Sequence, residues 1–173
     1  SGRAKVGTVS GTSISFGSET TFHNGNFSQP DIEFDSVNNK VVIVYADGGN
    51  SDYGTARVGT VSGTSISFGD AVVFNNGDTS TMGLTFDTTK NHFVIAYRDQ
   101  GDSNKANAIT ATISGSSLSF GTEASLTSGA ALYVKCAYDS NADKVLVAYQ
   151  DGANSDYGTA IVATASTDLT IGQ

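Results

Sequence analysis

The sequence predicts an all-β protein of antiparallel four-stranded blades, arranged like a β-propeller, with about three and a half blades in this chain. One segment returns at a fixed interval: residues 40–54 (KVVIVYADGGNSDYG) recur at 92–106 and 144–158, each copy starting 52 residues after the last. Within each 52-residue unit apolar and polar residues alternate with period two, and no helical stripe persists. Four short strands in a repeat of this length are typical of a propeller blade.

The first complete repeat shows how each strand is predicted. Ile32 and Phe34 alternate with polar neighbours in its first strand, and the second strand is continuously apolar, which suits a strand covered on both faces. A polar loop at 47–54 precedes the third strand, and a tight Ser-Gly-Thr turn leads to the fourth. We expect a glycine with positive φ at Gly77, where the repeat ends. The predicted strands are 31–35, 41–45, 55–61 and 65–74.

The strand count predicts a single repeat domain, 1–173, that does not close by itself. We expect a half-blade at 3–22 and blades at 28–74, 80–126 and 132–173. Because common closed propellers have at least four blades, the chain is either an excerpt of a longer array or a protomer that closes with a partner. Self-association, or further repeats of the same chain, is therefore expected. A solenoid is disfavoured, since parallel stacking would not produce the tight hairpin between the third and fourth strands.

The repeats resemble the tandem propeller-like repeats of uncharacterised secreted or virion-surface proteins. The run SDYGT at 51–55 is also similar to the Asp-box turn of sialidases, although Ala56 and Ala160 stand where that turn has an aromatic residue. The run also lies between the second and third strands rather than the third and fourth. The resemblance implies an extracellular or virion-surface location.

Composition narrows the classes of partner. A net charge of −8, from 17 acidic and nine basic residues, argues against nucleic acid and anionic membranes, which require a basic face. No apolar run approaches the length of a membrane span. The single cysteine, Cys136, aligns with Ile32 and Leu84 in the other repeats, so we predict a small buried hydrophobic residue rather than a nucleophile.

Residues present in every repeat are interpreted as structural, because a unique catalytic residue should break the repeat. Aromatic residues are expected to wedge between blades, and aspartates to accept backbone N–H groups in turns. The repeated positions are Asp35/Asp87/Asp139, Tyr45/Tyr97/Tyr149, Asp47/Asp99/Asp151 and Phe16/Phe68/Phe120.

The most variable window of the repeat predicts a recognition surface. It reads FSQPD at 27–31, TSTMG at 79–83 and ALYVK at 131–135, and it enters the first strand of each blade. Because strand directions alternate, this window and the acidic loop should emerge on the same rim, where loops on a rigid scaffold usually bear function. The alternative is that its aromatic residues seal blade junctions. The candidate ligand-binding residues are Phe27, Asn50, Tyr53, Tyr133, Asn154 and Tyr157.

The acidic loops raise the possibility of bound Ca²⁺, since clustered hard oxygen ligands near glycine suit this ion. The spacing differs from that of an EF-hand, and the alternative is a set of Asx turns that cap a hairpin. The candidate metal ligands are Asp47, Asp52, Asp99, Asp102, Asp151 and Asp156.

A non-catalytic binding module that recognises a glycan or a surface through this rim is the function we expect. The alternative is a structural repeat scaffold of a larger extracellular or virion-surface protein, and a glycosidase-like enzyme ranks third. His23 and His92 occupy different turn or surface positions of the repeat, which disfavours a histidine triad or a zinc site. A glycosidase requires a pair of carboxylates that lie close together. Four acidic residues are not repeated in every unit, and the sequence gives no indication that they converge: Asp31, Glu33, Asp70 and Glu123.

Overall fold

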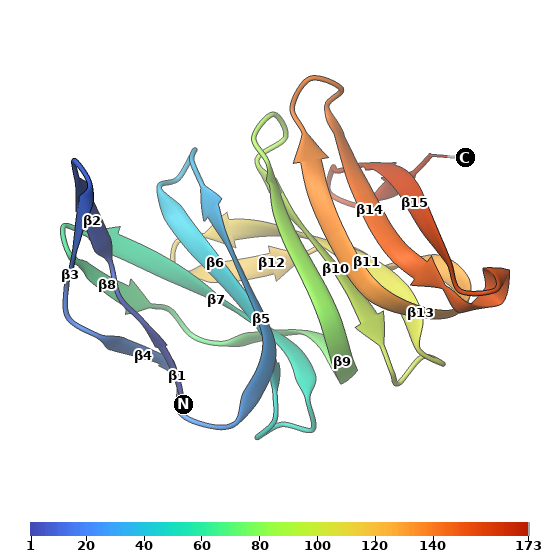
Figure 1. Cartoon of the computed structure of the whole chain (residues 1–173), viewed down its shortest axis with the longest axis horizontal. Helices are drawn as coiled ribbons and strands as arrows, with labels where there is room; N and C mark the ends of the chain where they lie inside the picture. Colours follow the sequence, from blue (N-terminus) through green and yellow to red (C-terminus); the bar gives the residue numbers. More distant parts are fainter. Residues whose placement is uncertain (173) are drawn as a thin grey trace.

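A computed structural model describes residues 1–172, and it confirms the all-β prediction. Sixteen strands are present, every paired strand is antiparallel to its neighbour, and the one helical element is the three-residue 3₁₀ turn η1 (Gly152–Asn154). Figure 1 shows the colours passing from blue at one end of an elongated molecule to red at the other, so successive parts of the chain follow one another along it. The repeat therefore extends along the molecule, so that sequence neighbours are neighbours in space.

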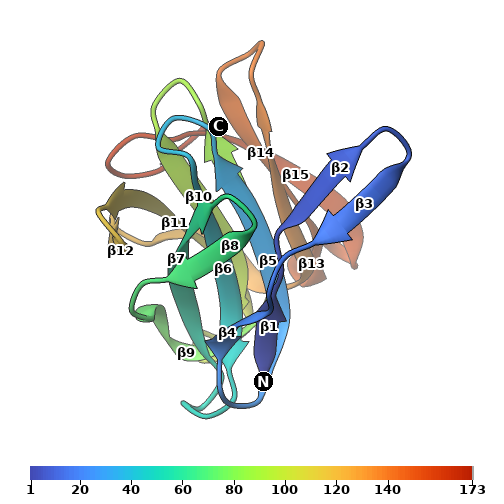
Figure 2. The ribbon, with the colours of Figure 1, turned by 90° about the vertical axis from the view of Figure 1, so that its left-hand side faces the viewer.

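The N-terminal partial unit, residues 1–26, consists of two short pairs of strands. Strand β1 (Gly2–Ala4) pairs with β4 (Thr20–His23), and β2 (Gly7–Ser10) forms a hairpin with β3 (Ser13–Phe16). Figure 2 shows this hairpin standing away from the main sheet. These strands correspond to the last two strands of a complete unit, as the sequence predicts.

Three complete units follow, at 27–78, 79–130 and 131–172. In the first, β5, β6 and β7 pair in order, and β7 then pairs along its length with both β8 and the start of β9. The other two units repeat this order, the third with a shortened last strand. The strand bounds are β5 (Phe27–Asp35), β6 (Lys40–Asp47), β7 (Tyr53–Ser62), β8 (Ser65–Phe68), β9 (Val72–Asp87), β10 (His92–Asp99), β11 (Lys105–Ser114), β12 (Ser117–Phe120), β13 (Ala124–Asp139), β14 (Lys144–Asp151), β15 (Tyr157–Thr164) and β16 (Thr170–Ile171).

The units are joined differently from the separate blades that the sequence suggests. Strands β9 and β13 each run from the last strand of one unit into the first strand of the next, which links all three units into one twelve-stranded sheet. Within residues 1–172 this sheet is open, with β5 and β16 at its ends. The predicted fourth strand at 65–74 is instead broken after Phe68. A Cβ atom on Gly69 would lie 1.9 Å from the Ser116 carbonyl oxygen, so the chain bends where the next unit approaches.

The prediction that Gly77 has positive φ is wrong. Positive φ occurs instead at Gly63 and its equivalents Gly11 and Gly115, in the Ser-Gly turns. Gly77 lies inside β9, where a Cβ atom would come 2.7 Å from Asp99 Oδ1. The repeat thus keeps this glycine to let a loop approach the backbone closely.

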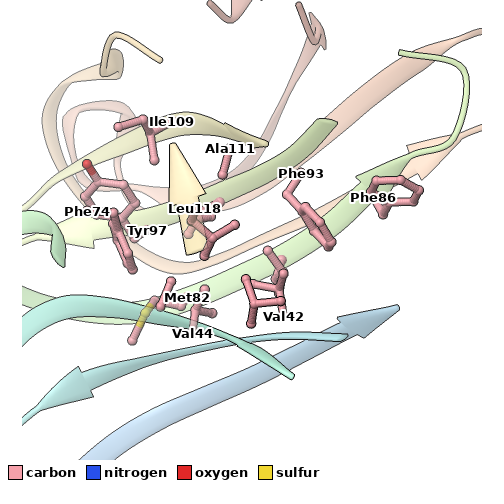
Figure 3. Packing of buried hydrophobic residues seen from close by; sticks show 14 of the residues in the cluster. Val42, Val44, Phe74, Met82, Phe86, Phe93, Tyr97, Ile109, Ala111 and Leu118 are labelled. Atoms are coloured by element: carbon pink, nitrogen blue, oxygen red, sulfur yellow. The ribbon is translucent and has the colours of Figure 1, made fainter. Parts of the chain in front are cut away.

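Each junction between successive units, which we call a seam, buries apolar side chains. The first seam joins the partial unit to the first unit, the second joins units one and two, and the third joins units two and three. In the second seam Phe93, Tyr97 and Leu118 pack against Val42 and Val44 (Figure 3). In the third seam, Val145 and Val147 pack into an equivalent cluster around Val94 and Ala96. Burial against a neighbouring unit, rather than within a single unit, therefore forms the core.

The turns between the first two strands of each unit are built by the repeated aspartates, as predicted. Asp35 Oδ1 accepts the backbone N–H groups of Val37 and Asn38, both at 2.8 Å. Asp87 and Asp139 do the same in units two and three. These carboxylates already accept hydrogen bonds within their own turns. They lie at the ends of β5, β9 and β13, outside the acidic loops.

Candidate functional site

The loops that follow β6, β10 and β14 lie beside the junctions between units. Figure 1 shows them at the end of the sheet opposite the turns that follow β5, β9 and β13. The Gly48 N–H donates to the Asn26 carbonyl at 3.0 Å, and the Ala131 N–H donates to the Asn104 carbonyl at 2.9 Å. We call this surface the acidic rim; it comprises the loops 47–53, 99–105 and 151–157 together with the variable windows 27–31, 79–83 and 131–135.

The first aspartate of each acidic loop forms an Asx turn. Asp47 Oδ1 accepts the Gly49 N–H at 2.9 Å, and Asp99 Oδ1 accepts the Gly101 N–H at 2.8 Å. Asp151 repeats the contact with Ala153 at 3.0 Å. The alternative to a metal site, a chain of Asx turns, therefore accounts for why this residue recurs in every unit.

The calcium prediction stays untested by these contacts. Among residues 1–172 no group of three or more His, Cys, Asp and Glu side chains is placed to hold a metal ion. Both carboxylate oxygens of Asp102 accept from Lys105 Nζ, at 3.0 and 3.1 Å. Asp52 and Asp156, which share the repeat position of Asn104, are exposed. Any Ca²⁺ would thus depend on one loop at a time, with backbone carbonyls completing its shell.

The variable windows contain a backbone feature that the sequence interpretation missed. Gln29, Thr81 and Tyr133 occupy the same repeat position, and all three have positive φ, at 53°, 40° and 56°. The pairing register of the strand shifts at each of them, which marks a β-bulge. Positive φ is costly for a β-branched residue such as Thr81, so three non-glycine residues in this conformation indicate that the bulge itself is kept while its side chain changes.

The structure separates the four candidate aromatic residues into two kinds. Phe27 packs edge-on against Phe22, with ring centroids 5.4 Å apart, and belongs to the cluster of the first seam. Tyr53 is half-buried. Tyr133 and Tyr157 are 71% and 66% exposed, respectively. The junction-sealing alternative is thus right for Phe27, whereas the third unit presents two aromatic side chains to solvent.

The polar candidates lie on the same loops. Asn50 and Asn154 are exposed at equivalent positions, and the Asn50 carbonyl accepts the Tyr53 N–H at 3.1 Å. Beside the second loop, Arg98 Nη2 donates to Asn104 Oδ1 at 2.6 Å. Three buried polar atoms at the bulge of the second unit have no partner within the described chain: Ser80 Oγ, Thr81 Oγ1 and Arg98 Nε.

A second feature missed from the sequence is a polar contact that spans all three units. Lys135 Nζ donates to the Met82 carbonyl and lies 3.7 Å from Asp31 Oδ2, which also accepts the Leu84 N–H at 3.1 Å. Asp31, Gly83 and Lys135 share one repeat position, and a Cβ atom on Gly83 would lie 2.7 Å from the Cys136 backbone nitrogen. The signal in the sequence is this change from acid to glycine to base at one position.

The groups considered for catalysis do not converge. His23 Nε2 lies 3.4 Å from Asp47 Oδ1 in the acidic rim, whereas His92 Nδ1 is 2.6 Å from the Lys90 carbonyl in a turn at the other end of its strand. Burial raises the pKa of the Cys136 thiol to about 12, and its Sγ atom lies 3.6 Å from the Val94 carbonyl. Cys136 is therefore a neutral thiol packed in the third seam.

Comparison with known proteins assigns no relative. No protein-family model matches the chain, and no curated protein matches it. No helix within residues 1–172 is long and apolar enough to cross a membrane. Functional inference consequently depends on the geometry of the acidic rim.

Proposed function

We propose that this chain is a non-catalytic recognition module that binds a glycan, or a surface rich in hydroxyl groups, through the acidic rim. The observation that supports it most directly is the exposure of Tyr133, in the variable window of the third unit, and of Tyr157, at the end of the loop 151–157. Exposed tyrosines offer a flat apolar face for stacking and a hydroxyl group for hydrogen bonding. Such side chains, beside exposed amide and carboxylate groups, suit a polyhydroxylated ligand.

The register of the third unit relates the strands that bear these two tyrosines. Ala131 in β13 pairs with Asp151 in β14, and Asp151 pairs with Tyr157 in β15. Tyr133 follows Ala131 at the bulge, so the two tyrosines belong to strands that are two apart in the sheet. Neighbouring strands are about 4.8 Å apart, which places the two strands roughly 10 Å from one another. Asn154 and Asp156 lie on the exposed loop between them.

The repeat supports recognition of an extended ligand. Each complete unit presents the same loop and the same bulge with different side chains, as a propeller blade presents its loops on one rim. Several weak sites on one rim can give high avidity without any tight site. We therefore favour an extended ligand on a cell or virion surface over a small soluble molecule.

The test is a glycan array probed with the wild-type chain and with Tyr133→Ala and Tyr157→Ala. We expect binding to at least one class of sugar, and a loss of affinity of roughly two- to tenfold in each variant, since an aromatic contact contributes about 0.5–1.5 kcal/mol. Phe34→Ala is the matched control, because it removes an exposed aromatic ring at the opposite end of the sheet.

Two results would contradict the proposal. One is no binding across neutral, acidic and sulfated sugars with the folded wild-type chain. The other is equal binding by all three variants, which would show that the rim aromatics are not contacts. The first result would favour the second candidate function, a structural repeat scaffold. The observation that supports this candidate is the exposure of apolar side chains at the two ends of the chain.

A further inference from the structure

The outer face of the third unit exposes apolar side chains that the other units bury. Leu146 and Val162 are 44% and 46% exposed, and Ala148 and Ala160 beside them are exposed too. The side chains at the same positions are packed inside the second and third seams, where the following unit covers them. These buried equivalents are Val42, Val44, Ala56 and Val58 in the first unit, and Val94, Ala96, Ala108 and Thr110 in the second.

The opposite end of the chain exposes the complementary face. Val9, Ile14 and Phe16 of the β2–β3 hairpin are all more than half exposed. Their equivalents in the second unit, Ile113, Leu118 and Phe120, pack against the first unit in the second seam. The hairpin thus exposes the side that, in the second unit, packs against the preceding unit.

The described seams repeat one contact in the same register. A Cβ atom on Gly17 would lie 1.8 Å from the Thr64 carbonyl oxygen, and Gly69 approaches the Ser116 carbonyl in the same way. Gly121 repeats the approach to the Thr167 carbonyl. Thr12 is the equivalent turn residue of the free hairpin, so both faces of a further seam are present on this chain, one at each end.

We propose that a second copy of this chain docks head to tail, with the outer face of its third unit on the β2–β3 hairpin of the first copy. The template is the seam already formed within the chain, which buries the same positions. Figure 1 shows the β2–β3 hairpin and the β14–β15 face at opposite ends of the molecule, so one copy cannot satisfy both by folding back. The contact uses two different surfaces and is heterologous, which produces a closed ring or an open filament.

The net charge of the chain should weaken the association of two copies, but it does not determine which faces meet. Each copy has a net charge of −8, and like charges on two copies repel. The seam positions themselves are apolar, so added salt should screen the repulsion while leaving the apolar contact intact. We therefore expect assembly to strengthen, rather than weaken, between low and moderate ionic strength.

The test is sedimentation velocity of the chain over a concentration series, with each end blocked in turn. Leu146→Glu with Val162→Glu blocks the tail face, and Val9→Glu with Phe16→Glu blocks the head face. These side chains are already exposed, so charge should be tolerated in the monomer, and unchanged far-UV circular dichroism checks the fold. The control is Val73→Glu, an exposed apolar residue of β9 that belongs to neither face.

We expect wild type and Val73→Glu to form species larger than a dimer as concentration rises, and each blocked variant to stay monomeric. An equimolar mixture of the two blocked variants should form one-to-one dimers and stop, because each supplies the one face that the other lacks. A wild-type chain that stays monomeric at several hundred micromolar would overturn the proposal. Dimers of a blocked variant alone would also overturn it, since they indicate an isologous contact.

A pair of cysteine variants keeps the test decisive if a charged variant unfolds. Phe16→Cys and Val162→Cys, mixed under mild oxidation, should form a heterodimer linked by a disulfide. The native Cys136 thiol is packed in the third seam and should not compete. Random cross-linking, with homodimers as frequent as heterodimers, would contradict head-to-tail docking.

Discussion

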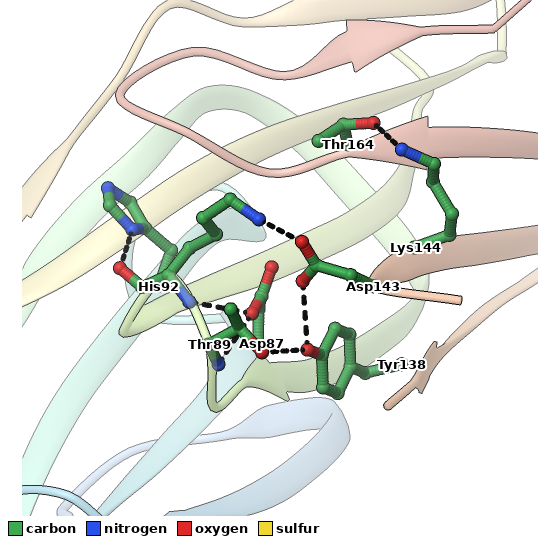
Figure 4. A network of polar contacts seen from close by, with 8 residues as sticks. Asp87, Thr89, His92, Tyr138, Asp143, Lys144 and Thr164 are labelled. Atoms are coloured by element: carbon green, nitrogen blue, oxygen red, sulfur yellow. Dashed lines mark hydrogen bonds and ion pairs between the residues drawn. The ribbon is translucent and has the colours of Figure 1, made fainter. Parts of the chain in front are cut away.

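The second and third seams have the same backbone but are held together by different chemistry. In the second seam the Phe86 and Phe93 rings are 4.8 Å apart, within a cluster of buried apolar side chains. The third seam has Tyr138 and Val145 at these two positions. There the Tyr138 hydroxyl group lies 2.8 Å from Thr89 Oγ1 and donates to Asp143 Oδ1 at 3.0 Å (Figure 4).

The same repeat position also changes from amide to ion pair. Asn38 Nδ2 donates to Asn91 Oδ1 at 3.3 Å across the second seam. The equivalent residues across the third seam are Lys90 and Asp143, which form a salt bridge beside the Tyr138 hydroxyl group (Figure 4). The comparison shows that the repeat specifies where two units touch, whereas individual side chains decide how strongly. We therefore expect the second seam to be stabilised mainly by apolar burial and the third seam partly by electrostatics.

The largest expected effect is loss of an aromatic ring from the second seam. Phe93→Ala should lower the free energy of unfolding by about 3–5 kcal/mol, because the fully buried ring leaves a cavity. Val145→Ala, at the same position of the third seam, removes two methyl groups and should cost only about 2 kcal/mol. Urea denaturation followed by circular dichroism measures both. Equal losses would show that the two seams do not differ in apolar stabilisation.

A smaller effect should follow from the ion pair of the third seam. The hydrogen bond from Lys90 holds the pKa of Asp143 below its usual value, and the same bond raises the pKa of Lys90. The pair therefore stabilises the fold fully above the unfolded carboxyl pKa of about 3.9 and below the unfolded lysine pKa of about 10.4. Its contribution is lost as pH falls through the lowered pKa of Asp143, or rises through the raised pKa of Lys90.

Asp143→Asn tests this prediction. At neutral pH the variant should melt below the wild type, and the difference should shrink as pH falls below 4 and the wild-type carboxylate becomes protonated. Added salt should also reduce the difference, since the pair is partly exposed. Asn91→Gly, which removes the amide acceptor of the second seam and suits the positive φ at this position, is the matched control and should show no such dependence on pH. A constant difference from pH 7 to pH 2 would argue against an electrostatic role.

The smallest expected effect concerns calcium and the acidic loops. If Ca²⁺ binds, the melting temperature should be higher in calcium than in chelator, because a ligand of the folded state stabilises it by mass action. The Asp52→Asn, Asp156→Asn double variant should lose that rise. Asp102→Asn should keep it, since Lys105 already occupies this carboxylate. Identical wild-type melting curves in calcium and in chelator would contradict the prediction that the chain binds Ca²⁺.

Much of the candidate site follows from alternation and repetition. Strand direction predicts that the variable windows and the acidic loops share one rim, and the backbone hydrogen bonds from Thr79 to Asp52 and from Ala131 to Asn104 place them side by side. The bulge at Tyr133 could not be predicted, because no glycine or other left-handed signal marks it. Nor could the packing of Phe27 be predicted, since its partner Phe22 is an apolar residue of a different unit.

The sequence by itself determined the local elements of this protein: the period of 52 residues, the Asx turns at Asp35 and the glycine turns at Gly63. These depend on a few neighbouring residues, and local conformational preference is enough to specify them. Only the tertiary structure decided which apolar residues are buried. Val94 and Leu146 occupy the same repeat position in near-identical strands, yet one is fully buried and the other 44% exposed. The difference is whether another unit packs against that face, and no property of the strand itself specifies that.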